Sequence, residues 1–261
     1  MIKYTPQTPP EDNINVLKEN PLLELSKLLG GVIGVTVILY LALGFFTELL
    51  MPLIPPRVEQ GLEPIARSFI RKYEAAPEHQ ARVQAVLAQL SQHYPQIPYP
   101  LHVHVQKSST FNAVTLPAGH IVIFTGLLET IKDENELAFV LAHELGHIHN
   151  RDHLKSMGRG ILFLLTSTAI LGSDNTISQV ISKSVEITDR QFSQKQEQDA
   201  DRFALHLLSA SYQHVGGSLS FFRRLSQREG TSGLAMLSTH PPTRERLKAM
   251  QRLITQEKLA L

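Results

Sequence analysis

Apolar residues form one long run near the start of the chain, between residues 28 and 47. No charged residue interrupts these twenty positions, and as a helix the run would be about 30 Å long, close to the thickness of a hydrocarbon core. A cleaved signal peptide is disfavoured, because Glu48 and Pro52 follow where small residues would be needed. The pattern predicts one transmembrane helix at residues 28–47, preceded by a polar tail at residues 1–27.

Beyond the prolines at positions 52, 55 and 56, which mark a domain boundary, the pattern becomes that of a folded domain over residues 57–261. Between residues 101 and 125, apolar and polar residues alternate in three short runs, which predicts a small antiparallel sheet. Elsewhere the apolar spacing is helical. The helices are expected over residues 57–75, 78–94, 176–210, 216–228 and 242–257 and from residue 133 onward.

The helix expected in the middle of the chain carries a start signal. Asp133 is followed three positions later by Glu136, as in a capping box, and apolar residues then recur along one face. A second apolar stretch, residues 160–173, is too short to cross a membrane comfortably. We expect this stretch to pack in the core or on a membrane surface.

The amino-acid composition excludes several kinds of partner and active site. The chain has 25 basic and 24 acidic residues, so it has no overall positive field to attract nucleic acid, and we expect no nucleic-acid partner. It has no cysteine, which excludes disulfides, thiol nucleophiles and cysteine-based zinc fingers. Any metal ion must therefore be bound by carboxylates and by some of the 12 histidines.

The strongest chemical signal is HELGH at residues 143–147, which matches the HExxH pattern. The two histidines are four positions apart, so on a helix His143 and His147 project from one face and can bind one zinc ion. Glu144 is then placed to act on a water molecule at the open metal position. The motif lies on the helix expected from Asp133, which is the setting that this chemistry requires. We therefore expect one catalytic zinc ion per chain.

A catalytic zinc ion needs a third protein ligand, and the sequence offers two candidates. His153 would complete HExxHxxNxxH, which is close to the metzincin pattern with Asn150 at the usual glycine position. Glu197 lies fifty residues beyond His147 and shares a helical face with Asp201, so this pair could supply a ligand and a carboxylate that orients a histidine. No clear Met-turn follows the motif, so we favour Glu197.

HELGH followed by NRDH, and then by EQDAD about fifty residues later, resembles the HtpX-type and CAAX prenyl endopeptidase-type membrane-associated zinc peptidases, which are gluzincins. The stretch at residues 112–128 is similar to the strand and turn before the zinc helix in that family, and residues 238–246 are similar to its THP element. The resemblance covers approximately residues 60–255. It implies that His143, His147 and Glu197 are the zinc ligands, that Glu144 is the catalytic base and that Asp201 orients His143.

The resemblance also has limits. HtpX-type members have several membrane helices, whereas this chain has one convincing span, so specificity for prenylated termini does not carry over. The pattern fits the singly anchored bacterial members better, many of which act in protein quality control. The expected fold is α+β: a mostly helical zincin-type domain with a small antiparallel sheet, plus one N-terminal transmembrane helix.

Two further residues could act at such a site. His240 precedes two prolines, which would hold it on a rigid loop before a helix, and it is a candidate catalytic residue. Arg246 is a second candidate, because it could bind a substrate carboxylate. It could equally pair with Glu245 or with a backbone carbonyl, and a local structural role stays open for His240 as well.

These observations predict a membrane-anchored zinc metalloendopeptidase that acts in protein quality control. The zinc ion would polarise the scissile carbonyl, and Glu144 would pass a proton from water to the leaving amine. An extended protein or peptide substrate would pair with the strand around residues 120–125. The alternative is a latent or non-catalytic zinc-bound chaperone or scaffold at the membrane, for example one in which His240 closes the open metal position.

The basic residues on the two sides of the apolar run are balanced. Lys18 and Lys27 precede it and Arg57 and Arg67 follow it, which is a tie under the positive-inside rule. Lys27 at one edge and Glu48 at the other favour a tail in the cytoplasm. We therefore expect a single-pass protein of the bacterial inner membrane that contacts lipid through its apolar run and has its catalytic domain in the periplasm.

Overall fold

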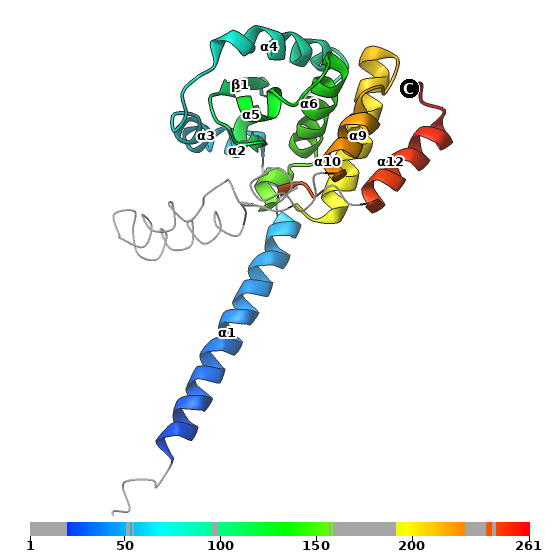
Figure 1. Cartoon of the computed structure of the whole chain (residues 1–261). Helices are drawn as coiled ribbons and strands as arrows, with labels where there is room; N and C mark the ends of the chain where they lie inside the picture. Colours follow the sequence, from blue (N-terminus) through cyan, green and yellow to red (C-terminus); the bar gives the residue numbers. More distant parts are fainter. Residues whose placement is uncertain are drawn as a thin grey trace, which may run out of the picture. The chain divides into compact units, whose positions relative to one another are not determined.

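The structure is a computed structural model that describes residues 20–50, 53, 55–95, 99–156, 158, 192–227, 239–241 and 244–261. The chain divides into two compact units, with the boundary between Phe45 and Phe46. The first unit contains most of helix α1 (Pro21–Leu50), and the second contains the other helices and strands that the structure describes (Figure 1). The predicted second apolar stretch, residues 160–173, lies outside the described residues.

Helix α1 contains the predicted apolar run and extends beyond it at both ends. It begins at Pro21, so the last part of the predicted polar tail is helical, and the Asn20 side chain accepts a hydrogen bond from the Leu22 amide at 3.0 Å. Within the described part of the chain, no helix is both apolar enough and long enough to cross a membrane. The exposed large apolar side chains of the run include Leu28, Val32, Ile38, Leu41 and Phe45.

The helix expected over residues 57–75 is in fact two helices, α2 (Pro56–Gln60) and α3 (Glu63–Ile70). The break has a local cause: Pro64 has no amide hydrogen to donate and fits the first turn of a new helix better than the middle of a long one. Helix α4 (Pro77–Ser91) follows close to its predicted position. Its buried face consists of Val83, Val86, Leu87 and Leu90.

Three strands form the sheet in the order β1-β3-β2: β1 (His102–Gln106), β3 (His120–Phe124) and β2 (Ala113–Leu116). Strand β3 runs antiparallel to β2 but parallel to β1, so the sheet is mixed and the predicted purely antiparallel sheet is wrong. The tight connection η2 (Pro117–Gly119) folds β3 back along β2, which leaves the far side of β3 for β1. Gly119 has a φ of 76°, a conformation that favours glycine.

The position of β3 also corrects the expected substrate contact. Its backbone groups pair with β1 on one side and with β2 on the other, so it cannot add a substrate strand, and the predicted role of residues 120–125 is wrong. The strand nearest the zinc helix is β2, whose Thr115 hydroxyl donates to Oε2 of Glu144 at 2.6 Å. Among the described residues, no strand pairs with the outer side of β2.

Further helices precede or follow the predicted zinc helix in the second unit. Helix α6 (Glu134–His149) begins as predicted, because the Asp133 side chain accepts a hydrogen bond from the Glu136 amide at 2.9 Å. The reciprocal half of the capping box is absent: the Glu136 carboxylate instead accepts from the Lys132 amide and pairs with Arg224. Helix α5 (Thr125–Leu128) precedes α6, and α9 (Gln194–Tyr212) packs along it, followed by α10 (Ser218–Gln227) and α12 (Arg244–Glu257) (Figure 1).

Candidate metal centre

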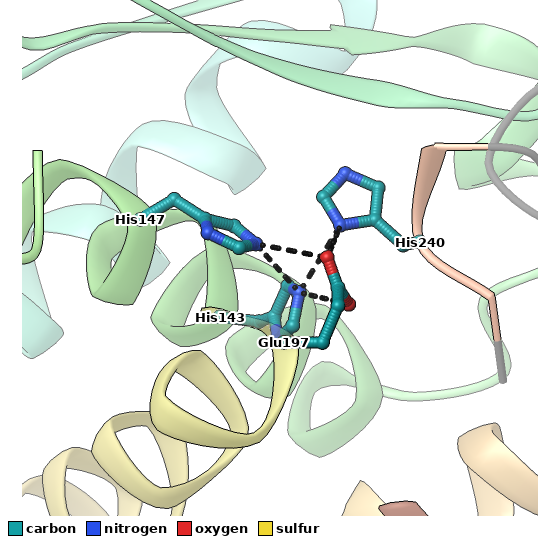
Figure 2. Close-up of side chains that lie close together, drawn as sticks. All are labelled: His143, His147, Glu197 and His240. Carbon is teal, nitrogen blue, oxygen red and sulfur yellow. Dashed lines mark hydrogen bonds and ion pairs between the residues drawn. The ribbon is translucent and has the colours of Figure 1, made fainter. Parts of the chain in front are cut away.

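Four buried side chains from separate parts of the chain meet inside the second unit (Figure 2). His143 and His147 come from α6, Glu197 comes from the first turn of α9, and His240 comes from the segment that precedes α12. Each side chain offers one ligand atom, and these atoms all lie within 4.8 Å of one another. None of the four is more than 3% exposed. The group has the size and the donor types of a site for a metal ion.

The close approach of α6 and α9 brings Glu197 to the two histidines. Gly146 lies directly against Ala200 of α9: a Cβ atom at Gly146 would come within 2.9 Å of the Ala200 Cα atom. Ala200 is one helical turn beyond Glu197, and Gly146 is next to His147. The glycine within HELGH is therefore what allows the two helices to place their ligand atoms together.

The distances between the donor atoms are those expected around a small metal ion. The two histidine Nε2 atoms are 3.2 Å apart, and the Glu197 carboxylate oxygens lie 3.5 Å from His143 Nε2 and 3.4 Å from His147 Nε2. Two ligands bound at about 2.0–2.1 Å to one tetrahedral zinc ion would be about 3.3 Å apart. The two Nε2 atoms and the two carboxylate oxygens of Glu197 therefore have a spacing that suits zinc.

Two further carboxylates set the orientation of the histidine rings. Nδ1 of His143 lies 3.0 Å from Oδ1 of Asp201, and Nδ1 of His147 lies 3.0 Å from Oδ2 of Asp152. With its ring proton on Nδ1, each histidine presents a bare lone pair at Nε2. In this tautomer two lone pairs and the Glu197 carboxylate point toward one another. A cation satisfies this arrangement, so the residues fit zinc.

The electrostatics of the pocket also favour positive charge. Burial lowers the pKa of His143, but the carboxylates of Asp201 and Glu197 outweigh it and raise the pKa to about 10. His147 behaves in the same way: burial lowers its pKa, and hydrogen bonding to Asp152 and Glu197 raises it above its usual value. In both cases the neighbouring carboxylates favour positive charge on the imidazole.

Arg246 holds two of these carboxylates in place. Its side chain is 3% exposed and donates two hydrogen bonds of 2.8 Å to the carboxylate of Asp201, and Nη1 lies 2.5 Å from Oε2 of Glu197. Burial raises the pKa of Glu197, but the charges of His240 and Arg246 hold it well below its usual value. The structure thus pairs Arg246 with the carboxylates of the site, and Nη1 also donates to the Pro241 carbonyl at 2.9 Å, a backbone carbonyl being one of the partners considered from the sequence.

Glu144 lies beside the group without belonging to it. Its side chain is fully buried, and Oε2 accepts a hydrogen bond from the Thr115 hydroxyl at 2.6 Å. The other oxygen, Oε1, has no hydrogen-bond partner among the described residues and lies 3.7 Å from Nε2 of His240. One oxygen is therefore anchored to β2 while the other is available to accept a proton.

The structure separates the two candidates for the third ligand. His153 is buried, but its Nε2 atom lies 2.9 Å from Oε1 of Glu59 and it is not part of the four-residue group. Glu197, by contrast, reaches both Nε2 atoms. The metzincin-like arrangement considered from the sequence therefore does not correspond to the geometry.

Sequence reasoning missed three residues at the site. Asp152, within NRDH, had a usable signal in its position three residues after the end of the predicted zinc helix. Thr115 and Phe192 gave no such signal, because their contacts depend on the tertiary fold. The Phe192 ring stacks on His147 at 4.0 Å between centroids, with 14° between the planes.

Residues 77–254 match the Peptidase family M48. The chain belongs to this family. The match spans the sheet, the zinc helix α6 and the helices that follow, and it confirms the predicted resemblance to zinc metallopeptidases. Membership in M48 and the four converging donors together identify the cofactor of the site as zinc.

Several relatives of this M48 chain carry protease names. The chain is 32% identical to the bovine (Bos taurus) mitochondrial metalloendopeptidase OMA1 over 174 residues. This aligned region covers 59% of this chain and 32% of that protein. It is 28% identical to the metalloproteases YcaL and LoiP of Escherichia coli K12, over 56% of this chain and 59% and 60% of theirs. The chain thus spans about a third of the length of the OMA1 protein and well over half of the bacterial relatives.

Proposed function

We propose that this M48 protein is a zinc-dependent metalloendopeptidase that is anchored to a membrane and acts in protein quality control. The observation that carries the proposal is the convergence of His143, His147 and Glu197 beside the unpaired oxygen of Glu144. The names of the relatives, metalloendopeptidase and metalloprotease, agree with it. A buried donor set of this kind with an adjacent carboxylate is the arrangement used for metal-assisted hydrolysis.

His143, His147 and Glu197 would hold the ion, and Asp201 and Asp152 would keep the two imidazoles in the tautomer that presents Nε2. Zinc bound there would polarise the carbonyl of the scissile peptide bond and make a water molecule more acidic. Within the protein, the Arg246 ion pairs keep Glu197 and Asp201 ionised. Arg246 therefore supports the site through the carboxylates and does not need to touch the substrate.

Glu144 is the proposed general base. Its Oε1 atom would take a proton from the attacking water and pass it to the leaving amine. The hydrogen bond from Thr115 fixes the other oxygen, so the carboxylate cannot rotate away from the reacting atoms. Because Glu144 is fully buried, bulk water does not compete for this proton.

The substrate would bind as an extended peptide along β2. This strand lies next to Glu144 and has no strand partner on its outer side among the described residues. A peptide added at that edge would bind through main-chain hydrogen bonds and place little demand on its side chains. Such recognition suits a quality-control protease that cuts many unfolded proteins.

One observation favours the second candidate, a latent enzyme or zinc-bound scaffold. Nδ1 of His240 lies 2.9 Å from Oε1 of Glu197 and 3.3 Å from Nε2 of His143, so His240 could act as a fourth ligand. In that arrangement it would occupy the position that water and substrate need. A His240→Ala variant distinguishes the two functions: hydrolysis should rise if His240 blocks the ion and should fall if His240 assists catalysis.

Membrane attachment would occur through residues 28–47. These residues lie within α1, a helix of 30 residues, and carry exposed large apolar side chains along its length. Exposed apolar surface of this extent is typical of contact with lipid or with another protein. The charges of Lys27 and Glu48 at its edges support a single-pass arrangement in the bacterial inner membrane, with the catalytic unit in the periplasm.

The proposal is tested with the purified full-length protein in detergent and an unfolded protein such as reduced casein as the substrate. Hydrolysis should stop when a chelator removes the metal and should return when zinc is restored. A protein that binds one zinc ion per chain but never cleaves the substrate would support the scaffold instead.

A further inference from the structure

A second buried network lies next to the metal centre and shares no residue with it. At its centre is Glu59 of α2, which is 1% exposed. Its Oε1 atom accepts a hydrogen bond from the Tyr99 hydroxyl at 2.8 Å and lies 2.9 Å from Nε2 of His153. Its Oε2 atom accepts from Nη2 of Arg151 at 3.0 Å. The mechanism proposed above uses none of these residues.

Two of the partners of Glu59 flank a residue of the metal centre. Arg151 and His153 stand on either side of Asp152, whose carboxylate lies 3.0 Å from Nδ1 of His147. Arg151 follows Asn150, the C-cap of α6, and Asp152 and His153 begin the next helical segment, residues 152–156. The Asp152 carboxylate is itself held from the side by Nε2 of Gln196, at 3.1 Å. Gln196 thus holds the side chain of Asp152, while Glu59 holds the residues on either side of it.

The turn needs such support. Arg151 has a φ of 55°, in the left-handed region, which is unfavourable for a residue with a side chain. Glycine is the usual residue at this position after a helix, because it adopts the conformation without that cost. In this chain the arginine occupies it, and its guanidinium pairs with Glu59.

Glu59 is suited to this role because it stays charged. Burial raises the pKa of its carboxyl, but His153, Tyr99 and Arg151 outweigh that effect and hold the pKa below its usual value. A buried carboxylate with three donors is rigid, because moving any one of them would leave a buried charge without its partner.

We infer that Glu59 is a positioning residue for the zinc ligand His147. By fixing Arg151 and His153 it holds the intervening Asp152 against Nδ1 of the ligand, and so keeps the Nε2 lone pair directed at the metal. The inference rests on the proposed zinc site. Carboxylates that orient a histidine ligand typically change metal affinity by about 10–100-fold when they are removed.

The experiment compares zinc affinity, measured by competition with a chromophoric chelator, in four full-length proteins: wild type, Glu59→Gln, Asp152→Asn and the double variant. Glu59→Gln should weaken zinc binding by about tenfold, and Asp152→Asn by about 10–100-fold. If Glu59 acts through Asp152, the double variant should bind zinc no more weakly than Asp152→Asn alone. Effects that multiply in the double variant would overturn the inference.

A matched control separates positioning from general loss of stability. Glu136 is also a 1% exposed carboxylate paired with an arginine, Arg224, but it lies at the opposite end of α6. Glu136→Gln should lower the melting temperature and leave zinc affinity unchanged. Equal losses of zinc affinity in Glu59→Gln and Glu136→Gln would overturn the inference.

A rescue variant tests the conformational part of the argument. Adding Arg151→Gly to Glu59→Gln should recover part of the lost zinc affinity, because glycine adopts the turn without help from Glu59. The absorption spectrum of the cobalt-substituted proteins should shift in Glu59→Gln and return toward that of wild type in the rescued protein. The absence of any recovery would contradict the role assigned to Glu59.

These readouts also distinguish this inference from the proposed function. A wild-type protein that binds no zinc would overturn both. Zinc binding without hydrolysis would overturn only the proposed activity, and the affinity comparison would still decide the role of Glu59.

Discussion

Replacing Gly146 by alanine tests how the fold assembles the metal centre. The new Cβ atom would lie 2.9 Å from the Cα atom, 3.0 Å from the carbonyl oxygen and 3.2 Å from the Cβ atom of Ala200. Ordinary contacts between carbon atoms are about 3.5–4.0 Å, so α6 and α9 must separate locally by about 0.6–1 Å. Glu197 is one turn away from Ala200 on α9, and it would move away from the two histidines.

We expect Gly146→Ala to destabilise the protein, whereas glycine-to-alanine substitution inside a helix ordinarily stabilises it. Without a clash, alanine in place of glycine inside a helix stabilises a protein by about 1 kcal/mol. Overpacking of a close contact costs about 1–3 kcal/mol, so we expect a net loss of about 1 kcal/mol and a fall in melting temperature of about 2–4 °C. Zinc affinity should fall by about tenfold or more, because binding sites tolerate displacements of only about 0.5 Å.

Thermal unfolding of the metal-free protein and chelator competition measure the two effects separately. Gly30→Ala is the matched control, since nothing lies within 4 Å of a Cβ atom at that position of α1. Adding Ala200→Gly to Gly146→Ala should recover part of the zinc affinity, because it removes one of the three close contacts. A Gly146→Ala protein with a raised melting temperature and unchanged zinc affinity would refute this reasoning.

Three further outcomes are expected. Glu197→Ala should lose stoichiometric zinc in metal analysis, whereas His153→Ala should retain it, because Glu197 and not His153 belongs to the group formed with His143 and His147. Burial and the neighbouring His104 lower the pKa of His120 from 6.5 to about 4. As the pH drops, His120 therefore becomes protonated in the unfolded chain before it does so in the folded protein. The free energy of unfolding should fall between pH 6.5 and about pH 4. Urea titrations across that range should show a smaller fall for His120→Asn. A shortened protein beginning at Pro55 should fold and bind zinc without binding lipid vesicles, and vesicle binding that persists would indicate that residues 160–173 also reach lipid.

Local signals in the sequence predicted the parts of the site that depend on a single helix. The spacing of His143 and His147 placed both on one face of α6, and Asp133 marked the start of that helix. Glu197 and Asp201 could be chosen because they also share one helical face and have the right chemistry. These features depend on 3.6-residue periodicity and capping, which are properties of neighbouring residues.

The parts that the sequence did not predict depend on contacts between distant segments. Alternation showed that three strands exist, but periodicity carries no information about strand order, so the central position of β3 was missed. The pairing of Arg246 with Asp201 requires α12 to pack on α9, and the contact of Glu59 with Arg151 joins segments that are far apart in the chain. A charged residue in a helical sequence looks the same whether it faces solvent or a buried partner.

The most direct test of the central claim is a comparison of wild type with Glu144→Gln for zinc content and for hydrolysis of an unfolded protein. The geometry places Glu144 beside the metal centre and outside the donor group, with one oxygen held by Thr115 and the other unpaired. Glutamine keeps the shape but cannot accept a proton from water. We therefore expect one zinc ion per chain and a rate lowered by about 10²–10⁴-fold. Near-normal hydrolysis by a Glu144→Gln protein with full zinc content would contradict the account.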